Sequence, residues 1–209
     1  MVKLSIQRLK EILKEINTDP QTAQQYYSRL SRILKFLNNN TGLKNAAVKE
    51  TGSRAKETDT RKSDIDVIFC TFPDQDHPTI RNHILEKAIS AFGKAAEVNL
   101  SGKAVHVDFR LPKCNFDLVY LSQKKFKEEG NKIKEIIKLR PVHKNAIKLV
   151  KYAFDKSGIK DIKGYEVEKA CLVVNATSLP DCVKNIVEYF KGRIEQKGLT
   201  IERVLQRLK

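Results

Sequence analysis

The chain has 209 residues and carries 40 Lys+Arg against 25 Asp+Glu, which gives a formal net charge of +15 at pH 7. With 41% hydrophobic residues it has enough apolar material for a core, which excludes a disordered basic tail. No apolar run approaches the roughly 20 residues needed to cross a bilayer, and charge begins too early for a signal peptide. Four cysteines without metal-ligand spacing (Cys70, Cys114, Cys171 and Cys182) predict reduced, buried thiols in a cytoplasmic protein.

The N-terminal part combines predicted helices with the first strands. Apolar residues at helical spacing predict helices over residues 3–16 and from Pro20 to residue 37. Asp19, directly before Pro20, is a typical N-cap. A short strand is predicted at 46–51, then a polar turn region from Gly52 to Ser63, and then a β-branched central strand at 64–70.

The pattern changes from mixed to purely helical along the rest of the chain. A helix is predicted at 79–92, followed by strands at 96–100, 104–111 and 114–121. From Ser122 onward the spacing predicts helices at 122–138, 141–156, 164–177, 179–196 and 200–208. We therefore predict an α+β fold with a mixed or antiparallel sheet in residues 1–121 and a helical lobe in residues 122–209.

The most informative stretch runs from Gly52-Ser53 to Asp64-Ile65-Asp66. Asp64 and Asp66 are two positions apart in a predicted strand, so both carboxylates leave the same face. Two neighbouring carboxylates repel each other unless a cation lies between them, and Mg²⁺ fits because it takes oxygen ligands and leaves positions for substrate phosphates. Upstream, Gly52 permits close approach of the backbone to a ligand, and the Ser53 hydroxyl with nearby N–H groups can hold phosphate oxygens.

The order of strand, Gly-Ser, ten residues, Asp-x-Asp and strand resembles the signature of the DNA polymerase beta-like nucleotidyltransferase superfamily. The spacing is similar to that of the poly(A) polymerase, archaeal CCA-adding and oligoadenylate-synthetase-like branches. One departure is Glu57, which stands where many relatives carry a second glycine and which predicts a stiffer or differently shaped loop. The resemblance covers residues 44–70 and 104–121 well, and residues 141–170 more loosely.

The resemblance implies a third carboxylate from a later strand, for which two acids qualify. Asp108 lies on the polar side of an alternating strand. Asp117 lies in an apolar run, where an acid without a counter-charge is costly to bury. We favour Asp117 and keep Asp108 as the alternative.

These residues together imply a two-metal, NTP-dependent enzyme. The resemblance makes Asp64, Asp66 and Asp117 both catalytic and metal-binding, with two ions of Mg²⁺ or Mn²⁺. An NMP from ATP or another NTP is then expected to move to a hydroxyl with release of pyrophosphate. The positive charge, which includes 13 Lys+Arg against 5 Asp+Glu in residues 124–163, favours an RNA or nucleotide acceptor and no membrane partner. An RNA-tailing or tRNA-end reaction is our first expectation, and the oligomeric state stays open.

Candidate contacts to the triphosphate lie on the helix predicted at 141–156. Lys144, Lys148 and Lys151 share one face of this helix, which is either solvated or turned toward phosphates. Residues 146–152 resemble the post-sheet helix of the oligoadenylate-synthetase-like and archaeal CCA-adding branches, which implies triphosphate contact by Lys151 first and Lys148 second. Tyr165 begins a segment that resembles the helix closing the nucleotide cleft, where it either stacks on a base or simply packs.

Other charged residues near the motif carry weaker signals. Four basic residues flank the predicted metal strand and either contact the substrates or form an ordinary charged loop: Arg54, Lys56, Arg61 and Lys62. The four histidines show no zinc spacing and are expected at the surface or as caps: His77, His83, His106 and His143.

Two other functions are compatible with the same motif. One is an oligonucleotide or cyclic-dinucleotide second-messenger synthase, although such relatives are normally longer. The other is a catalytically silent nucleotidyltransferase fold that binds RNA or nucleotides. Silent copies usually lose one of the paired acids, whereas this chain keeps both Asp64 and Asp66.

Overall fold

The computed structural model describes residues 3–40, 46–60, 63–110 and 113–209, which form two compact units. Within these ranges, unit 1 contains residues 3–17, 57–60 and 136–209, and unit 2 contains residues 18–56 and 63–135. The units divide the chain elsewhere than after residue 121, because the first helix groups with the C-terminal helices and residues 122–135 group with the sheet. The division into lobes at residues 1–121 and 122–209 stays a prediction.

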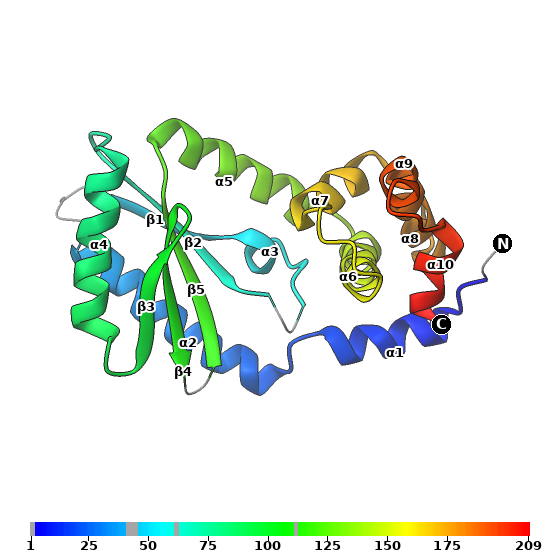
Figure 1. Ribbon diagram of the computed structural model, residues 1–209, viewed down its shortest axis with the longest axis horizontal. Helices are drawn as coiled ribbons and strands as arrows, with labels where there is room; N and C mark the ends of the chain where they lie inside the picture. Colours follow the sequence, from blue (N-terminus) through cyan, green and yellow to red (C-terminus); the bar gives the residue numbers. More distant parts are fainter. Residues whose placement is uncertain (1–2, 41–45, 61–62, 111–112) are drawn as a thin grey trace. The chain divides into compact units, whose positions relative to one another are not determined.

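Unit 2 is built on a five-stranded sheet in the order β1-β2-β5-β4-β3 (Figure 1). Its strands are β1 (Ala46–Thr51), β2 (Ile65–Thr71), β3 (Ala96–Ser101), β4 (Ala104–Arg110) and β5 (Lys113–Tyr120). Strands β2 and β5 are parallel and the other neighbouring pairs are antiparallel, which confirms the predicted mixed sheet and α+β class.

One face of this sheet is covered by two helices, α2 (Pro20–Asn40) and α4 (His77–Phe92). Alternate residues along the strands, such as Ile65, Val67 and Phe69 of β2, are buried in a common core with both helices. The residues between them face the other side of the sheet, because side chains alternate along a strand. That second face carries the acids singled out by the sequence.

Unit 2 also contains two helices outside this core, α3 (Gly52–Ala55) and most of α5 (Gln123–Ile137). The short α3 occupies part of the region predicted as a polar turn. Gly52 has φ +70°, a left-handed conformation that glycine adopts without steric cost. The chain therefore leaves β1 and begins a helical turn at once.

Unit 1 is helical and has its own apolar core. It contains α1 (Ile6–Ile16), α6 (Pro141–Lys156), α7 (Gly164–Val173), α8 (Leu179–Tyr189), α9 (Lys191–Glu195), α10 (Ile201–Leu205) and the 3-10 helix η1 (Gln206–Leu208). Helix α6 packs against α1, α7, α8 and α10. Its bounds match the predicted helix, whereas α7 ends at Val173, earlier than predicted, and Ser178 caps the next helix, α8.

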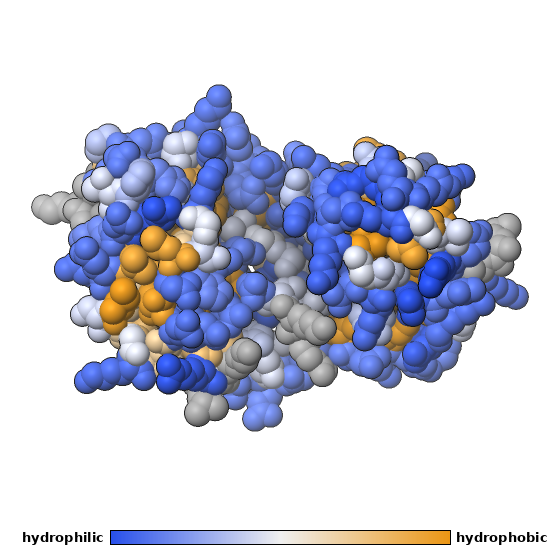
Figure 2. Space-filling model, viewed as in Figure 1, coloured by the Kyte–Doolittle hydropathy of each residue, from blue (hydrophilic) through white to orange (hydrophobic). Residues whose placement is uncertain are grey.

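The surface and the cysteines agree with the composition. The face drawn in Figure 2 is mainly hydrophilic, with hydrophobic residues gathered in a few patches. All four cysteines are free and buried, as predicted. In the part of the chain that the structure describes, no helix is long and apolar enough to cross a membrane.

Candidate active site

The strand register brings two of the predicted acids together on the face of the sheet opposite α2 and α4. Asp66 of β2 is the Cα partner of Asp117 on the parallel strand β5. Asp64 lies two residues before Asp66, directly ahead of β2, and its pKa is raised by burial and then by the charge of Asp117. The three acids therefore belong to one polar surface in unit 2.

Gly52 lies against the side chain of Asp66. A Cβ atom built on Gly52 would be 1.8 Å from Asp66 Oδ2, which no side chain could tolerate without displacing the carboxylate. The preceding residue, Thr51, is the Cα partner of Asp66 in the antiparallel β1–β2 pair. Glycine is thus required here by close approach and by its positive φ together.

The crowding of the acids is reflected in the raised pKa values of Asp66 and Asp64. Burial raises the pKa of Asp66 to about 6, and the charges of Asp117 and Asp64 act in the same direction. Burial also raises the pKa of Asp64, again with a contribution from the charge of Asp117. Neighbouring carboxylates in a partly buried place disfavour ionisation of one another, and a bound cation would relieve this.

Asp117 has a partner that the sequence did not point to. His106 Nδ1 lies 2.7 Å from Asp117 Oδ1, and His106 is the Cα partner of Asp117 on β4. Since an ionised carboxylate only accepts hydrogen bonds, the imidazole N–H is the donor. His106 keeps 23% of its side chain exposed, whereas the expected surface position is wrong for His143, which is only 8% exposed.

The alternative third acid, Asp108, lies on the same face of the sheet but farther along it. Its Cα partner on β5 is Asn115, two residues before Asp117. One carboxylate oxygen of Asp108 is buried without a hydrogen-bond partner among the described residues. Asp117, and not Asp108, is therefore the acid on the strand next to β2, directly opposite Asp66.

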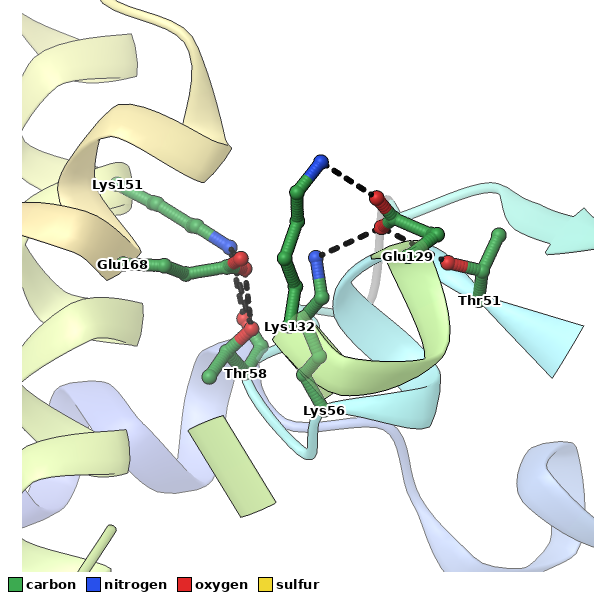
Figure 3. Close-up of polar contacts among 7 residues, drawn as sticks. All are labelled: Thr51, Lys56, Thr58, Glu129, Lys132, Lys151 and Glu168. Carbon is green, nitrogen blue, oxygen red and sulfur yellow. Dashed lines mark hydrogen bonds and ion pairs between the residues drawn. The ribbon is translucent and has the colours of Figure 1, made fainter. Parts of the chain in front are cut away.

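The basic residues between the two motifs have several different environments. The guanidinium of Arg54 lies 4.4 Å from the centre of the Tyr26 ring. Lys56 is buried at 6% exposure and pairs with Glu129 of α5 at 3.5 Å (Figure 3). Arg61 and Lys62 lie outside the described residues.

The lysines predicted to contact the triphosphate lie in unit 1, on α6, where each has a protein partner. Lys144 Nζ donates to Glu57 Oε2 at 2.6 Å, and Lys148 Nζ donates to Asn17 Oδ1 at 3.0 Å. Glu57 has φ +59°, the left-handed conformation typical of glycine. The loop thus holds Glu57 in a backbone conformation that glycine adopts without steric cost.

Lys151 takes part in a buried cluster within unit 1. Its ammonium lies 2.8 Å from Glu168 Oε1, and the Thr58 hydroxyl donates to the same oxygen at 2.7 Å (Figure 3). Thr58 is fully buried and Glu168 is 4% exposed. This side of α6 is therefore neither a fully solvated face nor an unoccupied one.

Tyr165 opens α7 with 56% of its surface exposed. The ammonium of Lys169 lies 5.5 Å from the centre of its ring. The tyrosine is therefore not packed in the core, which was one of the two expectations for it.

The donor set suits a hard cation. Among the described residues, no group of three or more His, Cys, Asp and Glu side chains is placed as a ligand cluster. Asp66 and Asp117 are nevertheless strand neighbours, burial and then the charge of Asp117 raise the pKa of Asp66, and Gly52 keeps the side of Asp66 free of a Cβ. Carboxylate oxygens in this arrangement fit Mg²⁺ or Mn²⁺.

Comparisons with known proteins identify the fold. No protein-family model matches the sequence, and no curated protein does. A structure of the Cid1 poly(U) polymerase with Mg 3'-dATP bound is similar at a TM-score of 0.69 and 12% identity, covering 88% of this chain and 72% of that one. The structure of the GLD-2/RNP-8 complex is similar at a TM-score of 0.66 and 12% sequence identity. The match covers 88% of this chain and 74% of that one.

A third solved structure, the CdnC:HORMA-deltaN complex of E. coli MS115-1, is similar at a TM-score of 0.64 and 15% identity, covering 88% and 70%. The chain therefore has the fold of the DNA polymerase beta-like nucleotidyltransferase superfamily, which confirms the resemblance drawn from the motif.

Proposed function

We propose that this chain is a metal-dependent nucleotidyltransferase that moves an NMP from an NTP to a hydroxyl of RNA and releases pyrophosphate. The observation that carries the proposal is the register pairing of Asp66 with Asp117, with Gly52 against Asp66 at the end of the adjacent strand. The fold, with its Gly-Ser and Asp-x-Asp motifs, supports the same chemistry.

In this proposal Asp64, Asp66 and Asp117 hold two divalent ions, Mg²⁺ or Mn²⁺. When bound, such ions neutralise charge on the phosphates and lower the pKa of the attacking hydroxyl. The raised pKa of Asp66 supports this role, because burial and neighbouring acids leave its carboxylate in need of a cation.

The chain's own groups orient the reactants and handle the proton. The hydroxyl of Ser53 and the backbone beside Gly52 bind phosphate oxygens of the nucleotide. Asp117 Oδ1 accepts from His106, so Asp117 Oδ2, the oxygen that His106 does not contact, accepts the proton of the attacking hydroxyl. His106 thereby holds Asp117 in one orientation.

The proposal also assigns nucleotide contacts to three residues of the helical unit. Lys151 contacts the triphosphate first and Lys148 second, and Tyr165 stacks on the base. The fixed position of Lys151 beside Glu168 supports its role, because an ammonium that is already held in place loses little freedom on binding phosphate. The exposure of the Tyr165 ring supports stacking.

The acceptor is proposed to be RNA because the chain carries a net charge of +15, which attracts a polyanion. The similar structures include a poly(U) polymerase and a cytoplasmic RNA terminal U-transferase, and the activities in these names support the same acceptor class.

The test is incorporation of each labelled NTP into a generic RNA with Mg²⁺. We expect product from the parent chain and a loss of at least about 100-fold, several kcal/mol of transition-state stabilisation, in Asp64→Asn, Asp66→Asn and Asp117→Asn. Asp108→Asn makes the same charge change on the same face of the sheet and should keep most of the activity.

Three outcomes separate the alternatives. Equal incorporation by the parent and Asp66→Asn contradicts the proposal. Products formed from NTPs without RNA indicate a second-messenger synthase, and RNA retained without product under any NTP indicates a silent binding module.

A further inference from the structure

The face of the sheet that carries Asp64, Asp66 and Asp117 is called the carboxylate face below. A buried lysine near it has no role in the reaction described above. Lys56 ends α3 with only 7% of its side chain exposed, and its ammonium lies 3.5 Å from Glu129 Oε1. A lysine is rarely buried unless it is paired, because removing an ammonium from water is costly. Lys56 is therefore held where it is by a specific partner.

That partner, Glu129, connects three elements of unit 2 (Figure 3). Its carboxylate accepts from the Thr51 hydroxyl at 3.2 Å and from Lys132 Nζ at 3.1 Å, besides pairing with Lys56. Burial acts to raise the pKa of Glu129, but the hydrogen bond from Lys132 and the charge of Lys56 outweigh it and the pKa is lowered. Glu129 is therefore ionised near neutral pH.

The pair reaches Asp66 through the end of β1. Thr51 is the strand partner of Asp66, and Gly52, the next residue, lies against the Asp66 carboxylate. Lys56 carries a positive charge and Glu129 a negative one, and the hydrogen bond from Thr51 to Glu129 holds the pair at this strand end. The two side chains thus act on the carboxylate face with opposite signs.

We propose that Lys56 is the resident counter-ion of the carboxylate face, that Glu129 holds it there, and that this pair sets the affinity of the face for divalent cations. The inference rests on the proposed function, because it assumes that Asp66 binds the ion. A divalent cation arriving at Asp66 is repelled by the ammonium of Lys56 and attracted by Glu129. Lys56 therefore makes the crowded acids tolerable without metal and weakens the binding of metal.

The two substitutions have opposite predicted effects. Lys56→Met removes the repulsion and should tighten metal binding by about three- to tenfold, the size expected for a partly screened charge pair. Glu129→Gln keeps an acceptor for Thr51 but removes the attraction, and should weaken binding by about the same factor. A residue with a merely structural role would weaken binding in both variants.

The experiment titrates each folded chain with Mn²⁺ at about pH 8 and measures free Mn²⁺ by electron paramagnetic resonance, without nucleotide. At this pH an acid with a pKa near 6 is ionised in every variant, so protons do not compete with the metal. Lys132→Met is the matched control, because Lys132 contacts the same glutamate but is 56% exposed. Its effect on Mn²⁺ affinity should stay within about twofold, since solvent screens exposed charges.

Two further variants keep every outcome decisive. Lys56→Arg retains the charge and should bind Mn²⁺ within about twofold of the parent, while Lys56→Gln replaces Lys56→Met if the latter does not fold. Unchanged or weaker binding in the neutral Lys56 variant, or binding in Glu129→Gln as tight as in the parent, overturns the inference. Undiminished Mn²⁺ binding by Asp66→Asn instead overturns the proposed function.

Discussion

Replacing Asp66 by asparagine tests whether the crowded carboxylates destabilise the metal-free fold. The pKa of Asp66 is about 6 in the folded chain, against an ordinary value of 3.8. The folded state therefore keeps a proton that the unfolded state has lost, and stability falls as the pH rises from about 4 through 6. At about 1.4 kcal/mol per pKa unit, this difference in pKa lowers the free energy of unfolding by about 3 kcal/mol at pH 8. At pH 4.5 it lowers the free energy of unfolding by about 1 kcal/mol.

Asp66→Asn removes the charge at almost unchanged volume, so it should be more stable than the parent by these amounts. The measurement is urea unfolding followed by circular dichroism at both pH values, with a chelator present. Excess Mg²⁺ at pH 8 should narrow the difference, because the ion stabilises only the parent. A variant that is no more stable than the parent at pH 8, or an advantage independent of pH, would refute the electrostatic reasoning.

Substitutions at three other sites, with a matched control for the first, test local geometry and charge. Gly52→Ala should abolish Mn²⁺ binding and nucleotidyl transfer because its Cβ displaces the carboxylate of Asp66, whereas Gly102→Ala, with φ +58° and no atom within 4 Å, should cost about 1 kcal/mol of stability and leave both readouts intact. Equal losses in the two alanine variants would contradict this assignment. Glu57→Gly should be about 1 kcal/mol more stable than Glu57→Ala in thermal unfolding, the reverse of the usual order in a helix, because only glycine relieves a φ of +59°. Glu168→Ala should destabilise the chain by about 3 kcal/mol in urea unfolding, since it removes the carboxylate that neutralises a largely buried ammonium, and a change below about 1 kcal/mol would show that the cluster is not structural.

The sequence was sufficient to predict most of the helices and strands, and to predict which acids share a face of the sheet. Alternation alone placed Asp64 and Asp66 on one side of their strand, and the apolar surroundings of Asp117 favoured it over Asp108. The direct pairing of Asp66 with Asp117 could not be derived in this way. It requires β5 to insert beside β2, ahead of β4 and β3 in the sheet, and local patterns contain no information on such a crossover.

One missed residue did leave a signal. Strands β4 and β5 pair as a hairpin, and extending the register outward from Phe109 and Cys114 places His106 opposite Asp117. Interpreting the strands predicted at 104–111 and 114–121 as a hairpin would have found this pair.

Other partners were beyond any local pattern. Glu129 is one acid among the many charges of α5, and its contact with Thr51 joins residues 78 positions apart. The lysine face of α6 was predicted from helical spacing, but its partners Glu57 and Asn17 come from distant segments. Helical periodicity identifies which side chains share a face and cannot say what covers it.

The discontinuity of unit 1 limits how the protein can be shortened. Leu9 and Ile12 of α1 are essentially inaccessible to solvent and belong to the same core as Ile186 and Val204 near the far end of the sequence. A fragment starting at residue 122 would lack this first helix and leave an apolar trough, and would therefore be prone to aggregation. Limited proteolysis should for the same reason nick the chain without releasing a soluble helical piece. Residues near both ends of the sequence, such as Leu4 and Leu208, belong to one helical core.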